Sequence, residues 1–397
     1  MRKHYNMKAL TTTVIVALSI LVGCGKPSDS TISSEDIISS SEVIIESKNN
    51  FYANPTYPIV NGAEDPTYLA DPYVIRDEVT KKYYMYTTQS EVNVQDSLVK
   101  YFKRGPVFES IDLVNWVYKA DVFESYVPTW GKSSAGVWAP TVAKIGDYYN
   151  FYYSLSVGGD DNPGIGVARS LTPYGPFEHY GKLFSSLEIG VTNSIDPHVF
   201  IDNGVVYMVF GSYGGLITLV ELTDDGLGLK NGLEYQKENK VALAGYTTYE
   251  MNNYEAALIL KYEGSYFLFL STGTCCSGAQ STYHVVMAKS DNVKGPYLDS
   301  RGRDMFGPKR GDQVIVPSLT GAMGVGHNGI AQDDLGEYWM IYHGYDTQGP
   351  KPDWRVTYLD KLVINKETGM FETLNKKATN GQELPGPYIN SLEGVTA

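Results

Sequence analysis

The chain has 397 residues, enough for one large domain or two ordinary ones, and its formal net charge at pH 7 is −13. Lys and Arg form no cluster beyond the first eight residues, and phosphate binding needs a Lys/Arg face, so nucleic acids and other polyanions are poor partners and no nucleic-acid partner is expected. The chain contains 32 Tyr against 13 Phe and 5 Trp. Tyrosine is a good strand residue, and its ring and hydroxyl also suit the surface of a sugar.

Residues 1–24 have the anatomy of a secretory signal. Three basic residues precede an apolar stretch at residues 9–22, which is shorter than the roughly twenty residues that span a bilayer as a helix. The stretch ends in Leu-Val-Gly-Cys, which resembles the lipobox of bacterial lipoproteins. This resemblance implies cleavage before Cys24 and acylation of its thiol, so we expect an extracytoplasmic protein anchored to a bacterial membrane. The alternative is an ordinary signal beside an incidental cysteine.

Residues 25–50 are rich in Ser, Glu, Asp and Ile and contain no aromatic residue. This composition predicts a flexible, acidic spacer. The rest of the chain, residues 51–397, is expected to form one folded domain and to act as a monomer.

A hairpin pattern recurs five times in this domain. In NSIDPHVFIDNGVVYMVFG (residues 193–211), an acid opens a short apolar run, Asp-Asn-Gly forms a turn, and a second β-rich run follows. The opening residues are Asp71, Ala139 with Trp138 beside it, Asp196, Glu255 and His327, at spacings of 68, 57, 59 and 72 residues. Such a repeat, with no helical pattern inside the unit, predicts an all-β fold, a five-bladed β-propeller. Because the first strand of each blade lines the axis, we expect the five openers to converge on one patch.

Three carboxylates in that patch predict glycoside hydrolysis. One carboxyl group, kept protonated, donates a proton to the leaving oxygen, and an ionised one activates water or attacks directly. A third acid nearby raises the pKa of the first. A separation around the axis leaves room for a water molecule and favours inversion. A lone Asp-Pro is also a common turn signal, but three acids at repeat-equivalent openers favour a chemical site.

His327 opens the fifth repeat, in GVGHNGI. An isolated histidine is more often a satisfied polar group than a ligand. On the axis of a propeller, however, a neutral imidazole could hold a hydrated cation at the floor of the pocket. We expect calcium there, with water completing most of its coordination shell, because calcium prefers oxygen ligands.

The acids also carry a family resemblance. Asp71 in LADPYVI, Asp196 in SIDPHVF and Glu255 in YEAALIL resemble the three acids of glycoside hydrolase family 43. This resemblance implies a five-bladed propeller that acts by inversion on arabinose- and xylose-containing polysaccharides. It implies that Asp71 is the general base and Glu255 the general acid. Asp196 would then tune the pKa of the acid and orient it.

Longer phrases resemble the endo-acting α-1,5-L-arabinanases of that family. They are VWAPTVAKIGDYYNFYYS, NSIDPHVF, FGSYGG, GHNGI and CCSGAQSTYHVVMAKSDNVKGPYLDSRGRDM. The resemblance implies plant cell-wall arabinan or arabino-oligosaccharides as partners and a calcium ion held by His327. It also implies that Trp138 stacks on a furanose ring, although a core tryptophan is the alternative. Asn193 and Ser212 would hydrogen-bond the sugar.

Some features depart from the arabinanases. Ala256-Ala257 follow the acid where the family usually has a small residue and then proline, and the loops at 301–323 and 345–354 differ. Rim loops decide whether a groove is open, so an exo-acting α-L-arabinofuranosidase or β-xylosidase stays an alternative. A catalytically inactive glycan-binding lipoprotein and a scaffold whose acids only bind calcium are further alternatives. The adjacent Cys275 and Cys276 form either a vicinal disulfide or two reduced thiols, with no catalytic role.

Overall fold

The computed structural model describes residues 50–58, 68–92, 101–124, 128–246, 253–318, 321–374 and 376–390. Contacts divide the chain into residues 1–46 and 47–397, and all described residues belong to the second unit. The predicted signal with Cys24, and the spacer up to residue 49, lie outside the described residues. Asn50, which the prediction placed in the spacer, belongs to the folded unit. It is buried, its side chain donates to the backbone oxygen of Asp112 (2.9 Å), and its own backbone oxygen accepts from Gly386 (2.9 Å).

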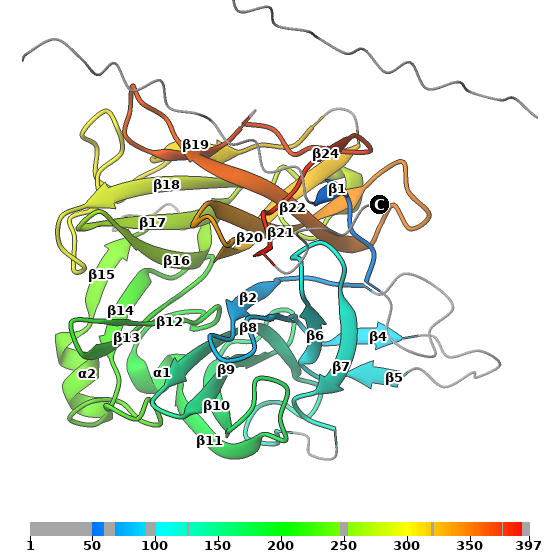
Figure 1. The fold of residues 1–397 in the computed structure, drawn as a ribbon. Helices are drawn as coiled ribbons and strands as arrows, with labels where there is room; N and C mark the ends of the chain where they lie inside the picture. Colours follow the sequence, from blue (N-terminus) through cyan, green and yellow to red (C-terminus); the bar gives the residue numbers. More distant parts are fainter. Residues whose placement is uncertain are drawn as a thin grey trace, which may run out of the picture. The chain divides into compact units, whose positions relative to one another are not determined.

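Five antiparallel sheets of four strands each form the fold (Figure 1). Blade one contains Tyr73–Arg76 (β2), Tyr83–Tyr86 (β3), Pro106–Ser110 (β6) and Val117–Asp121 (β7). Blade two contains Gly136–Ile145 (β8), Tyr148–Ser156 (β9), Gly164–Ser170 (β10) and Glu178–Ser185 (β11). Blade three contains His198–Asp202 (β12), Val205–Phe210 (β13), Ile217–Glu221 (β14) and Val241–Ala244 (β15). Blade four contains Tyr254–Tyr262 (β16), Ser265–Thr272 (β17), His284–Ser290 (β18) and Asp312–Ile315 (β19). Blade five contains Ala322–Gln332 (β20), Tyr338–Asp346 (β21), Arg355–Ile364 (β22) and Phe371–Thr373 (β23).

The first strands of the blades form a closed ring. Strand β2 contacts β8 and β20, β12 contacts β8 and β16, and β16 contacts β20. A hydrophobic cluster fills the space between each pair of neighbouring sheets. Most of the largest fully buried side chains are tyrosines, such as Tyr83, Tyr152 and Tyr342, so packing between sheets accounts for them. The predicted five-bladed β-propeller is confirmed.

The two ends of the described chain meet on blade five. Strand β1 (Phe51–Ala53) pairs with β24 (Glu383–Pro385), and Thr56 forms a β-bridge with Thr357 of β22. The side chain of Asn54 donates to the backbone oxygen of Leu359 (2.7 Å) and accepts from its N–H (2.8 Å). This pair of hydrogen bonds joins the Asn54 side chain to the backbone of β22, so the N-terminal segment is bound to blade five.

A few short elements lie outside the blades. They are the hairpin Ser90–Val92 (β4) and Tyr101–Lys103 (β5), the helices Ser186–Ile189 (α1) and Leu233–Asn239 (α2), and the 3₁₀ turn Gly278–Gln280 (η1). Among the described residues, no helix has the length and apolar character that a membrane span needs.

A buried carboxyl group lies beneath the seam between the chain ends. Asp360 accepts hydrogen bonds from the hydroxyls of Tyr342 (2.6 Å), Thr379 (2.8 Å) and Tyr52 (3.2 Å). None of the ion pairs within the described residues involves it. Burial raises the pKa of Asp360 from 3.8 to about 6, although these hydrogen bonds act in the opposite direction.

Asp360 is therefore expected to make the fold less stable as the pH rises. A folded pKa above the unfolded value gives stability that is complete below about pH 4 and is lost as the pH rises through about 6. We expect the free energy of unfolding to fall by about 2 kcal/mol more in the wild type than in Asp360→Asn between these limits. Urea unfolding at pH 4.5, 5.5, 6.5 and 7.5 measures the difference. Parallel curves for the two proteins would contradict this expectation.

Candidate active site

The five strand openings share one backbone feature. At each predicted opener or next to it, just before the innermost strand or within it, one residue adopts a left-handed φ between 43° and 58°, a region that non-glycine residues seldom occupy. These residues are Asp71, Ala139, Asp196, Ala256 and His327. Glu255 thus lies one residue before the left-handed position, at the place that Trp138 takes in blade two. The prediction that all three acids are equivalent needs this correction: Asp71 and Asp196 are equivalent, and Glu255 is offset by one residue.

At four of these five residues, the backbone N–H donates a hydrogen bond to a polar side chain of the neighbouring blade. The backbone N–H of Asp71 donates to His343 Nδ1 (3.1 Å), that of Ala139 to Thr88 Oγ1 (2.7 Å), that of Asp196 to Ser154 Oγ (2.9 Å), and that of His327 to Ser271 Oγ (2.9 Å). Blade four differs. There Ser212 donates to Glu255 Oε2 (2.6 Å), and the N–H of Ala256 donates to Asp196 Oδ2 (3.3 Å). In blade four, the Ser212 hydroxyl therefore donates to a carboxyl group, whereas the side chains at the other four positions accept from a backbone N–H.

The openings surround a cavity of about 550 Å³ to which all five blades contribute. It brings together the three acids, Trp138 and His327. Its lining consists of Tyr68, Asp71, Thr88, Gln89, Trp138, Ala139, Gly158, Ile195, Asp196, Glu255, Cys275, Cys276, His327 and Arg355. The structure therefore places the predicted openers of all five repeats around one hollow.

Asp71 lies in a positive and strongly hydrogen-bonded environment. Its Oδ1 lies 3.2 Å from Arg355 Nη1 and 3.3 Å from His327 Nδ1, and Thr88 donates to its Oδ2 (2.5 Å). Burial alone would raise the pKa of Asp71, but His327, Arg355 and His343 hold it well below its ordinary value. Burial lowers the pKa of both histidines, that of His343 to about 4. At neutral pH, Arg355 is therefore the permanent positive charge in this group, and Asp71 is ionised.

The other two acids have the opposite tendency. Burial raises the pKa of Asp196 well above its ordinary value, and the charges of Glu255 and Asp71 act in the same direction. Burial also raises the pKa of Glu255, against hydrogen bonds from Ser212 and from the Tyr283 hydroxyl, which donates to Oε1 (2.6 Å). The cavity thus pairs one ionised carboxylate with two carboxyl groups that tend to keep a proton. Pairs of acids with separated pKa values are what general acid and general base catalysis requires.

Comparison with known proteins places this cavity in a family. Residues 56–370 match the family described as glycosyl hydrolases family 43. The chain belongs to this family. It is 33% identical over 284 residues to the extracellular exo-α-(1→5)-L-arabinofuranosidase ArbA of Cellvibrio japonicus, which covers 66% of this chain and 78% of that relative. It is 27% identical over 271 residues to the extracellular endo-α-(1→5)-L-arabinanase 1 of Bacillus subtilis, covering 65% of this chain and 76% of that relative.

Solved structures of family 43 share the fold. The α-L-arabinanase of Cellvibrio cellulosa in complex with arabinohexaose superimposes with a TM-score of 0.66 at 27% identity, covering 78% of this chain and 96% of that chain. An exo-1,5-α-L-arabinanase from a bovine ruminal metagenomic library superimposes with a TM-score of 0.64 at 25% identity, covering 78% and 97%. The family therefore includes proteins named for exo action and proteins named for endo action among the relatives of this chain.

The predicted sugar contacts of this family 43 chain lie at different depths. Trp138 is half-buried and lines the cavity, packed so closely over Gly136 that a Cβ there would lie 2.8 Å from its Nε1. Ser212 is buried and donates to Glu255. Asn193 lies outside the cavity lining and donates to the backbone oxygen of Tyr213 (3.1 Å). Contact of these three side chains with a sugar stays a prediction.

Sequence analysis missed four residues that contact the acids. They are Thr88, Arg355, His343 and Tyr283. His343 lies on the second strand of its blade and accepts from the N–H of Asp71 in the next blade. Ser154 on β9 does the same for Asp196. Alignment of the second strands could therefore have found His343. Tyr283 ends the phrase CCSGAQSTY. Arg355 had no signal, because it begins the third strand of its blade, where neighbouring repeats carry no comparable cation.

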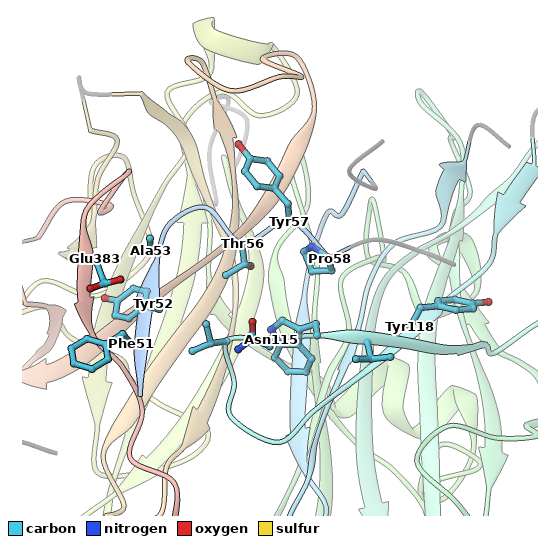
Figure 2. Close-up of a pocket in the computed structure, with 12 residues that line it drawn as sticks. Phe51, Tyr52, Ala53, Thr56, Tyr57, Pro58, Asn115, Tyr118 and Glu383 are labelled. Carbon is cyan, nitrogen blue, oxygen red and sulfur yellow. The ribbon is translucent and has the colours of Figure 1, made fainter. Parts of the chain in front are cut away.

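A second hollow lacks this chemistry (Figure 2). It has a volume of about 610 Å³ and lies between β1 with β24 on one side and β7 on the other. Phe51 and Glu383 lie at one end and Tyr118 at the other. Glu383 is the one carboxylate of its lining, and it shares no residue with the cavity of the three acids. We therefore assign the chemistry to the axial cavity.

Proposed function

We propose that the protein hydrolyses α-1,5-L-arabinofuranosidic bonds of arabinan with inversion, by endo cleavage. The observation that supports this proposal best is the cavity that contains an ionised Asp71 and a Glu255 with a raised pKa. Asp71 takes a proton from the attacking water, and Glu255 gives its proton to the departing sugar oxygen. The negative charge of Asp71 helps Glu255 to hold that proton, because like charges in one pocket raise a pKa. Asp196, whose Oδ2 accepts from the N–H of Ala256 beside Glu255, modulates and orients this acid.

A second candidate is exo action on the same bonds. It is favoured by the 33% identity to a relative that is named an exo-α-(1→5)-L-arabinofuranosidase. A time course on debranched linear arabinan, with β-xylan as a parallel substrate, separates the two candidates. Early release of mixed arabino-oligosaccharides supports endo cleavage. Arabinose alone from the first minutes, or xylose from xylan, supports the exo enzyme. No product from either polymer, together with arabinan binding, would favour a glycan-binding protein.

We also propose that a calcium ion binds near His327. Within the described residues, no group of three or more His, Cys, Asp or Glu side chains could hold a metal, so water would complete most of the coordination shell. Buried polar atoms without a described partner fit a hydrated interior. They are both side-chain polar atoms of Asn328, Thr141 Oγ1 and His198 Nδ1, on the innermost strands of three blades. A bound cation would supply positive charge that favours the ionised form of Asp71.

Removal of calcium is therefore expected to lower thermal stability. An ion that binds only the folded state stabilises it by mass action, so we expect EDTA to lower the Tm by about 5 °C and added calcium to restore it. In His327→Ala, calcium should leave the Tm unchanged. Differential scanning calorimetry measures both proteins, with magnesium as the control ion. A Tm that EDTA does not move would contradict the proposal.

For residues outside the described part, we propose lipid attachment at Cys24. The apolar stretch and lipobox-like ending support this proposal, and the relatives named above are described as extracellular. In a bacterial host, Cys24→Ser should move the protein from the membrane fraction to the soluble fraction. Retention of the variant in the membrane would argue for another anchor.

A further inference from the structure

The adjacent cysteines lie in the catalytic cavity. Cys275 and Cys276 are joined by a disulfide, and both line the hollow that contains Glu255. Cys275 is half-buried and Cys276 is exposed, so the pair is accessible to a molecule in that cavity. The loop that carries the pair connects β17 and β18 of blade four. Blade three separates it from blade two, which contributes Trp138, so these two groups belong to different walls.

Hydrogen bonds close the base of this loop. The N–H of Thr282 donates to the backbone oxygen of Thr274 (3.1 Å), and the N–H of Thr274 donates to Thr282 Oγ1 (2.9 Å). Gly273 has a φ of +99°, and a Cβ there would lie 2.4 Å from the Thr282 backbone oxygen. Nearer the tip, the N–H of Ser277 donates to Ser281 Oγ (2.9 Å). The disulfide is thus presented by a braced loop, and such preorganisation reduces the entropy cost of binding.

Both ends of the loop are tied to the surroundings of the acid. At its start, the hydroxyl of Tyr213 donates to the backbone oxygen of Gly273 (2.8 Å). At its end, the hydroxyl of Tyr283 donates to Glu255 Oε1 (2.6 Å). These two contacts fix the position of the disulfide relative to the carboxyl group that protonates the leaving oxygen.

We propose that the Cys275–Cys276 disulfide is a specificity-determining wall of the cavity, which contacts the C–H face of a sugar unit bound beside Glu255. This inference rests on the proposed function. A disulfide carries no hydrogen-bond donor, and its sulfur atoms are polarizable and apolar, so they pack favourably against C–H groups. Two thiols would rotate independently and carry S–H donors. An exported protein keeps such a disulfide oxidised.

The test compares Cys275→Ser/Cys276→Ser with the wild type and with Ala279→Ser. Ala279 lies in the same loop, is exposed and is outside the cavity lining, so its variant is the matched control for an added hydroxyl. On linear arabinan we expect the double variant to raise KM about tenfold, with kcat within about threefold and an unchanged pH profile. Reduction of the wild type with TCEP should reproduce the rise in KM. TCEP should not affect the double variant.

Each outcome supports or overturns the proposal. An unchanged KM in the double variant and in the reduced wild type, while the wild type hydrolyses arabinan, overturns the contact and leaves the proposed function intact. A shifted pH profile or a loss confined to kcat would mean that the loop acts through Tyr283 on Glu255, and this also overturns the contact. If the wild type releases no product from arabinan, the proposed function fails and the contact fails with it. Reduced wild-type protein keeps the test valid even if the double variant folds poorly.

Discussion

Replacement of Glu255 by glutamine should lower kcat on arabinan about a thousandfold, because general acid catalysis typically contributes 10²–10⁴-fold. The departing oxygen of a sugar is a strong base, so it needs the proton of Glu255. A substrate with an acidic leaving group, such as a dinitrophenyl arabinofuranoside, needs no such proton. We therefore expect the variant to lose much less activity on this aryl substrate than on arabinan.

The same variant should keep its fold. Burial and the charge of Asp71 raise the pKa of Glu255, so a neutral amide replaces a group that already tends to be neutral. The hydroxyls of Ser212 and Tyr283 both donate to this side chain, and one of them must rotate to accept from the amide. Glu263→Gln, at an exposed position after the same strand, is the matched control. Equal losses on arabinan and on the aryl substrate would show that Glu255 is not the acid.

Much of the fold could be predicted from sequence because the repeat has a physical cause. Each blade needs an apolar inner strand, a polar turn and an aromatic second strand, and these leave a pattern that periodicity reveals. The pattern found Asp71, Asp196 and His327 at equivalent positions. It could not reveal the one-residue offset of Glu255, because the left-handed residue in blade four is Ala256, and an alanine carries no signal for positive φ.

Ring closure and the partners of the acids depend on contacts between distant residues. Asn54 reaches Leu359 across more than three hundred residues, and Arg355 reaches Asp71 across nearly as many. Neither contact repeats from blade to blade, so the periodicity of the sequence cannot predict it. What the sequence predicts here is the set of strand openings, and what it omits is the network that sets the charge of each carboxyl group.

Replacement of Asp71 by asparagine should lower both activity and stability. Asparagine tolerates the left-handed φ of 57° at this position, so the backbone is kept, but the base that accepts the proton of water is lost. We expect kcat on arabinan to fall about a thousandfold or more. Unlike Glu255→Gln, this variant leaves Arg355, whose side chain is only 13% exposed, without its carboxylate partner. Leaving a buried charge unpaired costs about 3 kcal/mol, which urea unfolding measures.

A second substitution separates the two effects of Asp71→Asn. Arg355→Met removes the unpaired charge and keeps an unbranched apolar stem, so Asp71→Asn/Arg355→Met should recover most of the lost free energy of unfolding. Its kcat should stay as low as that of Asp71→Asn, because stability returns without a base. Recovery of activity together with stability would mean that Asp71 only neutralises Arg355. Near wild-type turnover in Asp71→Asn alone would remove it from the reaction altogether.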